Sequence, residues 1–179
     1  MAKIIPLSVY RDQTAIRDGF QLWRTLFDEP FDGETRLSDL KPKTLGYLAD
    51  PGDRSTAALH ALIIGCCGHG ASTPFEALDS TVQSRIIDIF LFLSDQIRFE
   101  MMLRLGWVDR YWGNRHPLFK MVTAFEQIRE GCHNHWPTLA KNHCEYGRYA
   151  DLIERDQQVF IRRMFPSALT AFKLRFRLK

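Results

Sequence analysis

Apolar residues recur at helical spacing over most of this chain. The first such pattern spans about 14–27 and has an apolar face at positions i, i+4, i+7 and i+11, formed by Ile16, Phe20, Trp23 and Phe27. Apolar residues at this spacing lie along one side of an α-helix. We therefore expect one amphipathic helix here, ending before Pro30 because proline cannot continue the hydrogen-bonded ladder.

The longest apolar pattern predicts a helix over about 80–105. Asp79 or Ser80 can cap its first turn, and Gly106 can adopt the left-handed conformation that ends many helices. Its apolar residues cover most of the circumference rather than one stripe. A helix of this kind is buried on several sides, so we expect it to lie at the centre of the fold.

Shorter patterns predict helices over about 40–48, 55–63, 116–131 and 148–165, with Pro166 ending the last of them. Together these elements indicate a mainly α fold. We expect a helical bundle or orthogonal array of about five to six helices around the buried helix at 80–105. The length of the chain favours a single helical domain over residues 1–179.

The two ends of the chain show a different period. Residues 3–10 alternate weakly, and residues 172–179 alternate strictly between apolar and basic side chains. Alternation of this kind is typical of a β-strand, so we expect short extended N- and C-terminal segments, with 171–179 a basic, amphipathic, strand-like tail. The two segments could pair with each other or with a second subunit, which predicts a homo-oligomer.

Charge is distributed unevenly along the chain. The formal net charge is +3, yet all 21 acidic residues lie in 1–156 and the last 23 residues carry only basic ones. The six basic residues are Arg162, Arg163, Lys173, Arg175, Arg177 and Lys179. A basic segment of this kind can bind nucleic acid or an acidic partner, although such runs more often form a solvated face.

No stretch resembles a signal peptide, and the longest apolar run, residues 89–93, is far shorter than the roughly 20 residues of a membrane-spanning helix. We therefore expect no membrane partner and a cytoplasmic location. In that compartment the four cysteines would be reduced thiols.

Cysteine and histidine are concentrated in two short segments. Residues 66–69 contain three of them and residues 132–144 contain five. Cys132 and His135 have a spacing suited to chelation, and His143 or Cys144 could supply further ligands. Mixed Cys and His ligands are typical of zinc sites, so Cys132, His135, His143 and Cys144 form the candidate metal site. The alternative is that the cysteines pack as small apolar groups and the histidines face water.

Two further chemistries are consistent with the composition. Cys67 or Cys132 could act as a nucleophile if a neighbouring histidine activated its thiol. Aromatic residues 107, 111 and 112, interleaved with Arg110 and Arg115, could stack on bases, although such rings more often fill the core. The preferred hypothesis is a binding, regulatory or interaction module that self-associates. The alternatives are a zinc-dependent protein or enzyme and a nucleic-acid-binding protein.

Overall fold

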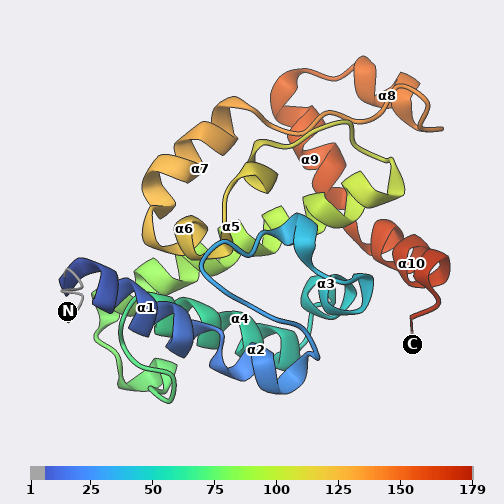
Figure 1. Cartoon of the computed structure of the whole chain (residues 1–179). Helices are drawn as coiled ribbons and strands as arrows, with labels where there is room; N and C mark the ends of the chain where they lie inside the picture. The colour runs from blue at the N-terminus through green and yellow to red at the C-terminus, as the bar shows by residue number, and fades with distance from the viewer. Residues whose placement is uncertain (1–6, 179) are drawn as a thin grey trace, which may run out of the picture.

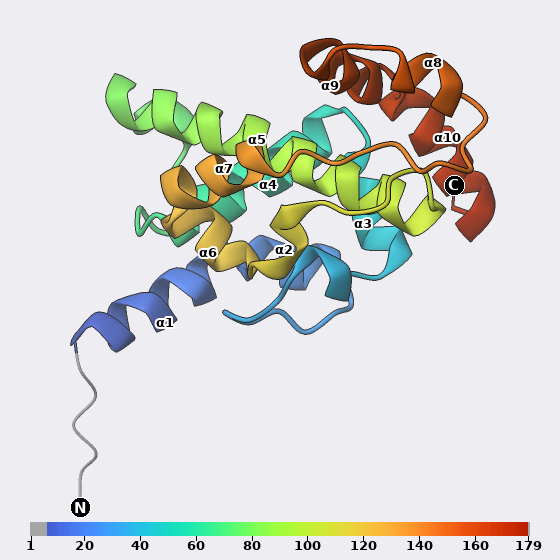
Figure 2. The same ribbon diagram turned by 90° about the horizontal axis from the view of Figure 1, so that it is seen from above.

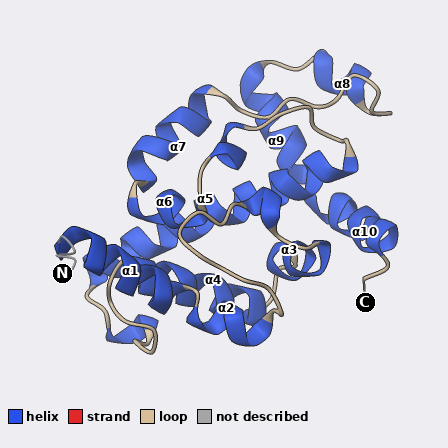
Figure 3. Cartoon of the chain, in the orientation of Figure 1, coloured by secondary structure: helices blue, strands red, loops and turns tan. Residues whose placement is uncertain are grey.

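The computed structural model of the protein describes residues 7–178, and all regular structure in that range is helical (Figures 1 and 3). The α-helices are α1 (Leu7–Gly19), α2 (Gln21–Leu26), α3 (Pro42–Ala49), α4 (Asp53–Cys66), α5 (Ser80–Leu105), α6 (Leu118–Thr123), α7 (Phe125–Asn134), α8 (Tyr146–Ala150), α9 (Glu154–Arg163) and α10 (Phe165–Phe176). Three 3-10 turns join them: η1 (Leu37–Asp39), η2 (Phe75–Ala77) and η3 (Trp112–Arg115). The mainly α prediction is confirmed.

Helix α5 is the centre of this arrangement, as its apolar circumference predicts. The Asp79 side chain accepts a hydrogen bond from the Val82 backbone N–H at 3.0 Å, and Gly106 ends the helix in the left-handed region at φ 74°. Its 26 residues pack against α3, α4 and α10. Figure 1 shows the other helices distributed around α5, and Figure 2 shows α1 extending outward from them.

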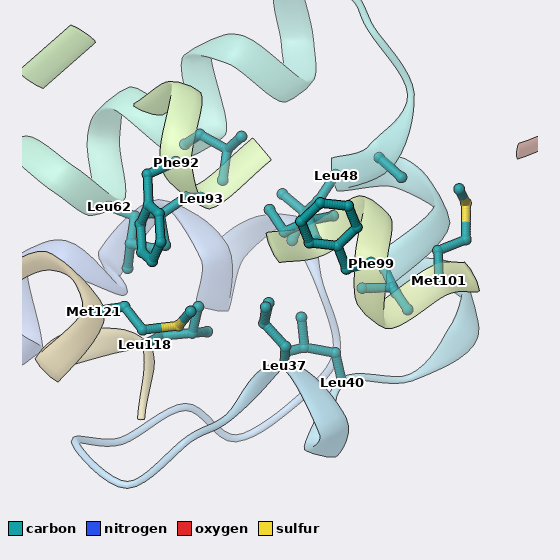
Figure 4. Close-up of a cluster of buried hydrophobic side chains, with 14 of the residues drawn as sticks. Leu37, Leu40, Leu48, Leu62, Phe92, Leu93, Phe99, Met101, Leu118 and Met121 are labelled. Carbon is teal, nitrogen blue, oxygen red and sulfur yellow. The ribbon is translucent and has the colours of Figure 1, made fainter. Parts of the chain in front are cut away.

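The buried side chains form one continuous hydrophobic cluster that includes residues from Phe20 to Phe172. Figure 4 shows part of it, where η1, α3, α4, α5 and α6 meet. The cluster is rich in aromatic rings, among them a group formed by Phe20, Trp23, Phe27 and Phe31. The Trp23 indole N–H donates to the Ala58 carbonyl at 2.8 Å, which satisfies its polar atom inside the core.

The strand prediction for the C-terminal tail is wrong, because residues 172–176 belong to α10. Phe165, Ala168 and Phe172 stand at i, i+3 and i+7 and are buried, so burial against α3 and α5 selects the helical period. The alternation of 172–178 is therefore coincidental: Leu174, expected on the same face as Phe172, is 76% exposed. Residue 179 lies outside the described range.

The prediction of an extended N-terminal segment is wrong for residues 7–10, the part of it that the structure describes. Residues 7–10 form the first turns of α1, while residues 3–6 lie outside the described range. Residues 7–178 therefore contain no strand through which the protein could self-associate as predicted. Oligomerisation itself stays a prediction.

Several predicted helices are each divided into two. The pattern at 14–27 covers part of α1 and all of α2, 116–131 covers α6 and most of α7, and 148–165 covers part of α8 and all of α9. Pro166 does not simply end a helix; it stands at the second position of α10, where its missing N–H breaks no hydrogen bond. Apolar periodicity continues across such breaks because both pieces bury the same side against one core.

Candidate functional site

The structure separates the residues of the predicted zinc site. Cys132 is buried on α7, and its Sγ lies 3.8 Å from Oε1 of Gln96. His135 is exposed, with Nδ1 2.9 Å from the Gly131 carbonyl. The two residues that suggested a chelate also line different cavities, Cys132 one of about 310 Å³ and His135 one of about 260 Å³.

His143 and Cys144 lie side by side, with Nδ1 and Sγ 3.9 Å apart, and the same Nδ1 accepts the Glu145 backbone N–H at 3.2 Å. Between residues 7 and 178, no three side chains of the His, Cys, Asp or Glu type gather closely enough to hold a metal ion. Zinc binding stays a prediction that the described geometry does not support.

The environments of three thiols oppose nucleophilic chemistry. Burial raises the pKa of the Cys132 thiol to about 11 and raises the pKa of Cys66 still further. Burial also raises the pKa of Cys67, although the nearby Arg85 guanidinium acts in the opposite direction. A reactive cysteine needs a lowered pKa, since the thiolate is the nucleophile. These three cysteines therefore behave as packing groups at neutral pH.

Alkylation rates should distinguish these three cysteines from the exposed Cys144. On treatment of the folded protein with iodoacetamide at pH 8 under reducing conditions, we expect exposed Cys144 to be modified first. A shift of the Cys132 pKa from 9.0 to about 11 leaves about 100-fold less thiolate, and burial slows its reaction further. Peptide mass spectrometry gives the order of modification. Alkylation of Cys132 or Cys66 as fast as Cys144 would contradict these environments.

A groove of about 690 Å³ opens between α3, the start of α4 and the end of α10. Four basic side chains from these three helices line it: Lys43, Arg54, Lys173 and Arg177. Two carboxylates, Asp50 and Asp53, share the lining, so the ionised side chains leave a net charge of +2. Tyr47 and Leu178 supply apolar surface.

Helical register explains why these residues converge. Lys43 and Tyr47 stand at i and i+4 on one side of α3, and Asp50 is the C-cap of that helix. Lys173 lies in the last turn of α10, and Arg177 is its left-handed C-cap. The two basic and polar stripes face each other across the groove because α3 and α10 pack together.

Gly46 permits the close approach of α10 to α3. A Cβ at this position would lie 2.8 Å from Cδ1 of Leu178 and 3.7 Å from the Phe172 ring. The absence of a side chain leaves room for the Leu178 side chain, which follows α10. Gly46 therefore helps to shape one wall of the groove, although glycine costs stability in the interior of a helix.

The charges in the groove are only partly paired. Lys173 Nζ contacts Asp50 Oδ2 at 2.6 Å. Within residues 7–178, Lys43, Arg54 and Arg177 take part in no ion pair, and all three are exposed. Asp53 is the remaining carboxylate, in the first turn of α4. The groove thus presents three uncompensated cations against one such anion.

The start of α4 also faces this groove. Its N-cap is Gly52, and no side chain caps the first turn. The Ser55 hydroxyl lies within hydrogen-bond distance of the carbonyls of Asp50 and Gly52, at 2.5 and 2.9 Å, so it caps no N–H group of the first turn. The first backbone N–H groups of a helix carry partial positive charge, so they add to the basic character that the side chains create.

Arg177 has an unusual backbone conformation. With φ 53°, it is the one non-glycine residue between 7 and 178 in the left-handed region, and it forms the C-cap of α10. Glycine is favoured at such a cap because a Cβ is crowded in this conformation, at a cost of roughly 1 kcal/mol or more. The chain keeps a long basic side chain where glycine would be more stable.

Sequence reasoning missed this groove. The basic C-terminal residues are evident in the sequence, but the strand prediction places Lys173, Arg175 and Arg177 on one face. In the helix Arg175 turns away, donating to the Leu105 carbonyl at 3.3 Å. The available signal was the i, i+4 spacing of Lys173 and Arg177, read as a continuation of the pattern that begins at Phe165.

No family model, no curated protein and no solved structure matches this chain in the comparisons made. Across residues 7–178, none of the helices has both the length and the apolar character needed to cross a bilayer.

Proposed function

We propose that the protein is a binding module for a small phosphorylated molecule, which it holds by its phosphate groups in the groove between α3, α4 and α10. The observation that carries the proposal is the convergence of Lys43, Arg54, Lys173 and Arg177 from three helices on one concave surface. Arginine and lysine are the side chains that bind phosphate most often, arginine through paired hydrogen bonds and lysine as a point charge.

The size of the groove favours a small ligand over a macromolecule. Ligand cavities commonly measure roughly 300–1,000 Å³, and about 690 Å³ lies within that range. The uncapped start of α4 adds backbone donors of the kind that bind anions at helix N-termini. An incoming phosphate would compete with Asp50 for Lys173, since the 2.6 Å ion pair lies within the groove.

The conformation of Arg177 gives independent support. Backbone strain persists where the surrounding structure or the function requires the residue, and it is concentrated at binding sites. A role in holding an anion accounts for a basic residue at a position that favours glycine. The proposal is consistent with the binding-module hypothesis from the sequence, and it requires neither zinc nor self-association.

The Arg177→Gly variant tests the proposal. We expect isothermal titration with sodium pyrophosphate at low salt to show one site in the native protein. The variant should bind at least tenfold more weakly while its free energy of unfolding rises by about 1 kcal/mol, because glycine relieves the left-handed cap.

Arg155→Glu is the control, since Arg155 is exposed on α9 and lies outside the groove. This variant should bind pyrophosphate within about twofold of the native protein. Unchanged affinity in Arg177→Gly, or an equal loss in Arg155→Glu, would overturn the proposal.

A further inference from the structure

A second concave surface combines aromatic rings with basic side chains. It measures about 260 Å³ and is lined by the rings of Tyr111, Trp112, His135 and Trp136 and by Arg110 and Arg115. Its walls are two segments, 107–116, which contains η3, and 135–140, which follows α7. We refer to these six side chains as the aromatic–arginine groove.

Backbone pairing holds the two loops together. Val108 and Leu139 form an isolated antiparallel bridge, the only one between residues 7 and 178. The Asp109 N–H donates to the Thr138 carbonyl at 3.1 Å, and the Ala140 N–H donates to the Trp107 carbonyl at 2.9 Å. Loops fixed in this way present their side chains in a set arrangement, as a preformed binding site requires.

Individual rings are anchored as well. The Tyr111 hydroxyl donates to Glu100 Oε2 at 2.8 Å. Trp112 lies directly over Gly131 of α7, where a Cβ would come within 2.7 Å of the indole ring. Trp136 packs edge-on against Phe99 at 5.0 Å between ring centroids. The groove thus has rigid aromatic walls rather than mobile surface side chains.

The exposed ring of His135 and two exposed guanidinium groups remain available to a ligand, whereas Arg162 lies over the Trp136 ring at 4.8 Å and His116 packs against Trp112 at 4.4 Å. Trp112 and Trp136 are half-buried, and the exposed His135 ring lies nearly parallel to Trp112, at 6.0 Å and 21°. Arg110 and Arg115 are exposed, and in the described part of the chain neither forms an ion pair. Asp109, the nearest carboxylate along the chain, is exposed and pairs with neither guanidinium.

We infer that the aromatic–arginine groove binds one base of a single-stranded nucleic acid, with Arg110 and Arg115 contacting the flanking phosphates. Base stacking on aromatic side chains, combined with basic residues along the backbone, is how single strands are bound without reading of their sequence. About 260 Å³ accommodates one planar base rather than a larger ligand. The inference is independent of the proposed phosphate site between α3, α4 and α10, because the two sites share no lining residue.

Fluorescence anisotropy with a dye-labelled octauridylate tests the inference. We expect binding at low salt that weakens steeply as salt rises, because phosphate contacts release counterions. The double variant Arg110→Glu/Arg115→Glu should bind at least tenfold more weakly. His135→Ala, which removes an exposed ring together with its contact to the Gly131 carbonyl, should lose about threefold or more, given the contribution of one stacked ring.

Two controls distinguish binding at the aromatic–arginine groove from nonspecific electrostatic attraction and from binding in the groove between α3, α4 and α10. Arg155→Glu/Arg163→Glu changes the net charge by the same amount at exposed positions on α9 and should bind octauridylate within about twofold of the native protein. Arg177→Gly should also leave this affinity unchanged. Absence of binding at low salt, or equal losses in the two double variants, would overturn the inference. Uridine monophosphate binding as tightly as the octamer would overturn the assignment to a nucleic-acid strand.

Discussion

Replacing Gly65 by alanine is expected to lower the free energy of unfolding by about 3 kcal/mol, the upper end of the usual cost of overpacking. Gly65 of α4 lies against the end of α1, where a Cβ would stand 2.5 Å from the Gly19 Cα and 2.6 Å from the Asp18 carbonyl carbon. Because these are backbone atoms, no rotamer change can remove the clash. The two helices would have to separate, and α1 packs mainly on α4.

Gly147→Ala is the matched control for this substitution. Gly147 is also helical, in α8, and a Cβ there would meet nothing within 4 Å. Alanine should be neutral or slightly stabilising at this position because of its higher helix propensity. Urea unfolding of both variants measures the difference. A loss below about 1 kcal/mol for Gly65→Ala would contradict the close crossing of α1 and α4.

Replacing Arg104 by methionine is expected to cost about 3–5 kcal/mol, the usual penalty for removing one partner of a buried ion pair. Arg104 Nε contacts Glu100 Oε1 at 2.8 Å, and their side chains are only 18% and 4% exposed. The same guanidinium donates to the carbonyls of Leu37, Ser38 and Leu40 at 2.8–3.0 Å. Methionine would leave the Glu100 carboxylate without its cation and the η1 segment without its attachment to α5.

The Arg148–Glu145 pair provides a control with similar geometry and different burial. Its atoms are 2.9 Å apart, yet the two side chains are 79% and 39% exposed. Arg148→Met should therefore cost at most about 0.5 kcal/mol, as is typical of exposed pairs. Equal losses for the two variants, measured by chemical unfolding, would show that burial does not set the strength of the Arg104 contact.

The central helix could be predicted closely because its signals are local. Asp79, Gly106 and the apolar residues between them lie within one segment, and each performs the role expected from its chemistry. The C-terminal helix could not be predicted in this way, because the apolar residues of 172–178 fit both the two-residue period of a strand and the 3.6-residue period of a helix. The choice between them depends on burial of Phe165, Ala168 and Phe172 against other helices, which is a property of the whole fold.

The candidate site was harder to predict for the same reason. The His and Cys residues of 132–144 are close in sequence, but α7 directs Cys132 inward and leaves His135 exposed, so they line different cavities. The groove between α3, α4 and α10 is formed by residues that are distant in the sequence. Lys173 and Asp50, which form an ion pair within it, are 123 positions apart along the chain. The zinc site predicted from proximity in sequence therefore stays a prediction, and the groove depends on residues that are far apart in the sequence.

The proposal that the protein binds a phosphorylated ligand between α3, α4 and α10 is tested most directly by mapping pyrophosphate onto the native protein in solution. Amide and arginine side-chain resonances should be followed by NMR during the titration. We expect saturable shifts confined to residues 43–55 and 173–178, including the Arg54 and Arg177 side chains. Shifts spread over exposed basic residues elsewhere, or no saturation at millimolar pyrophosphate, would contradict it.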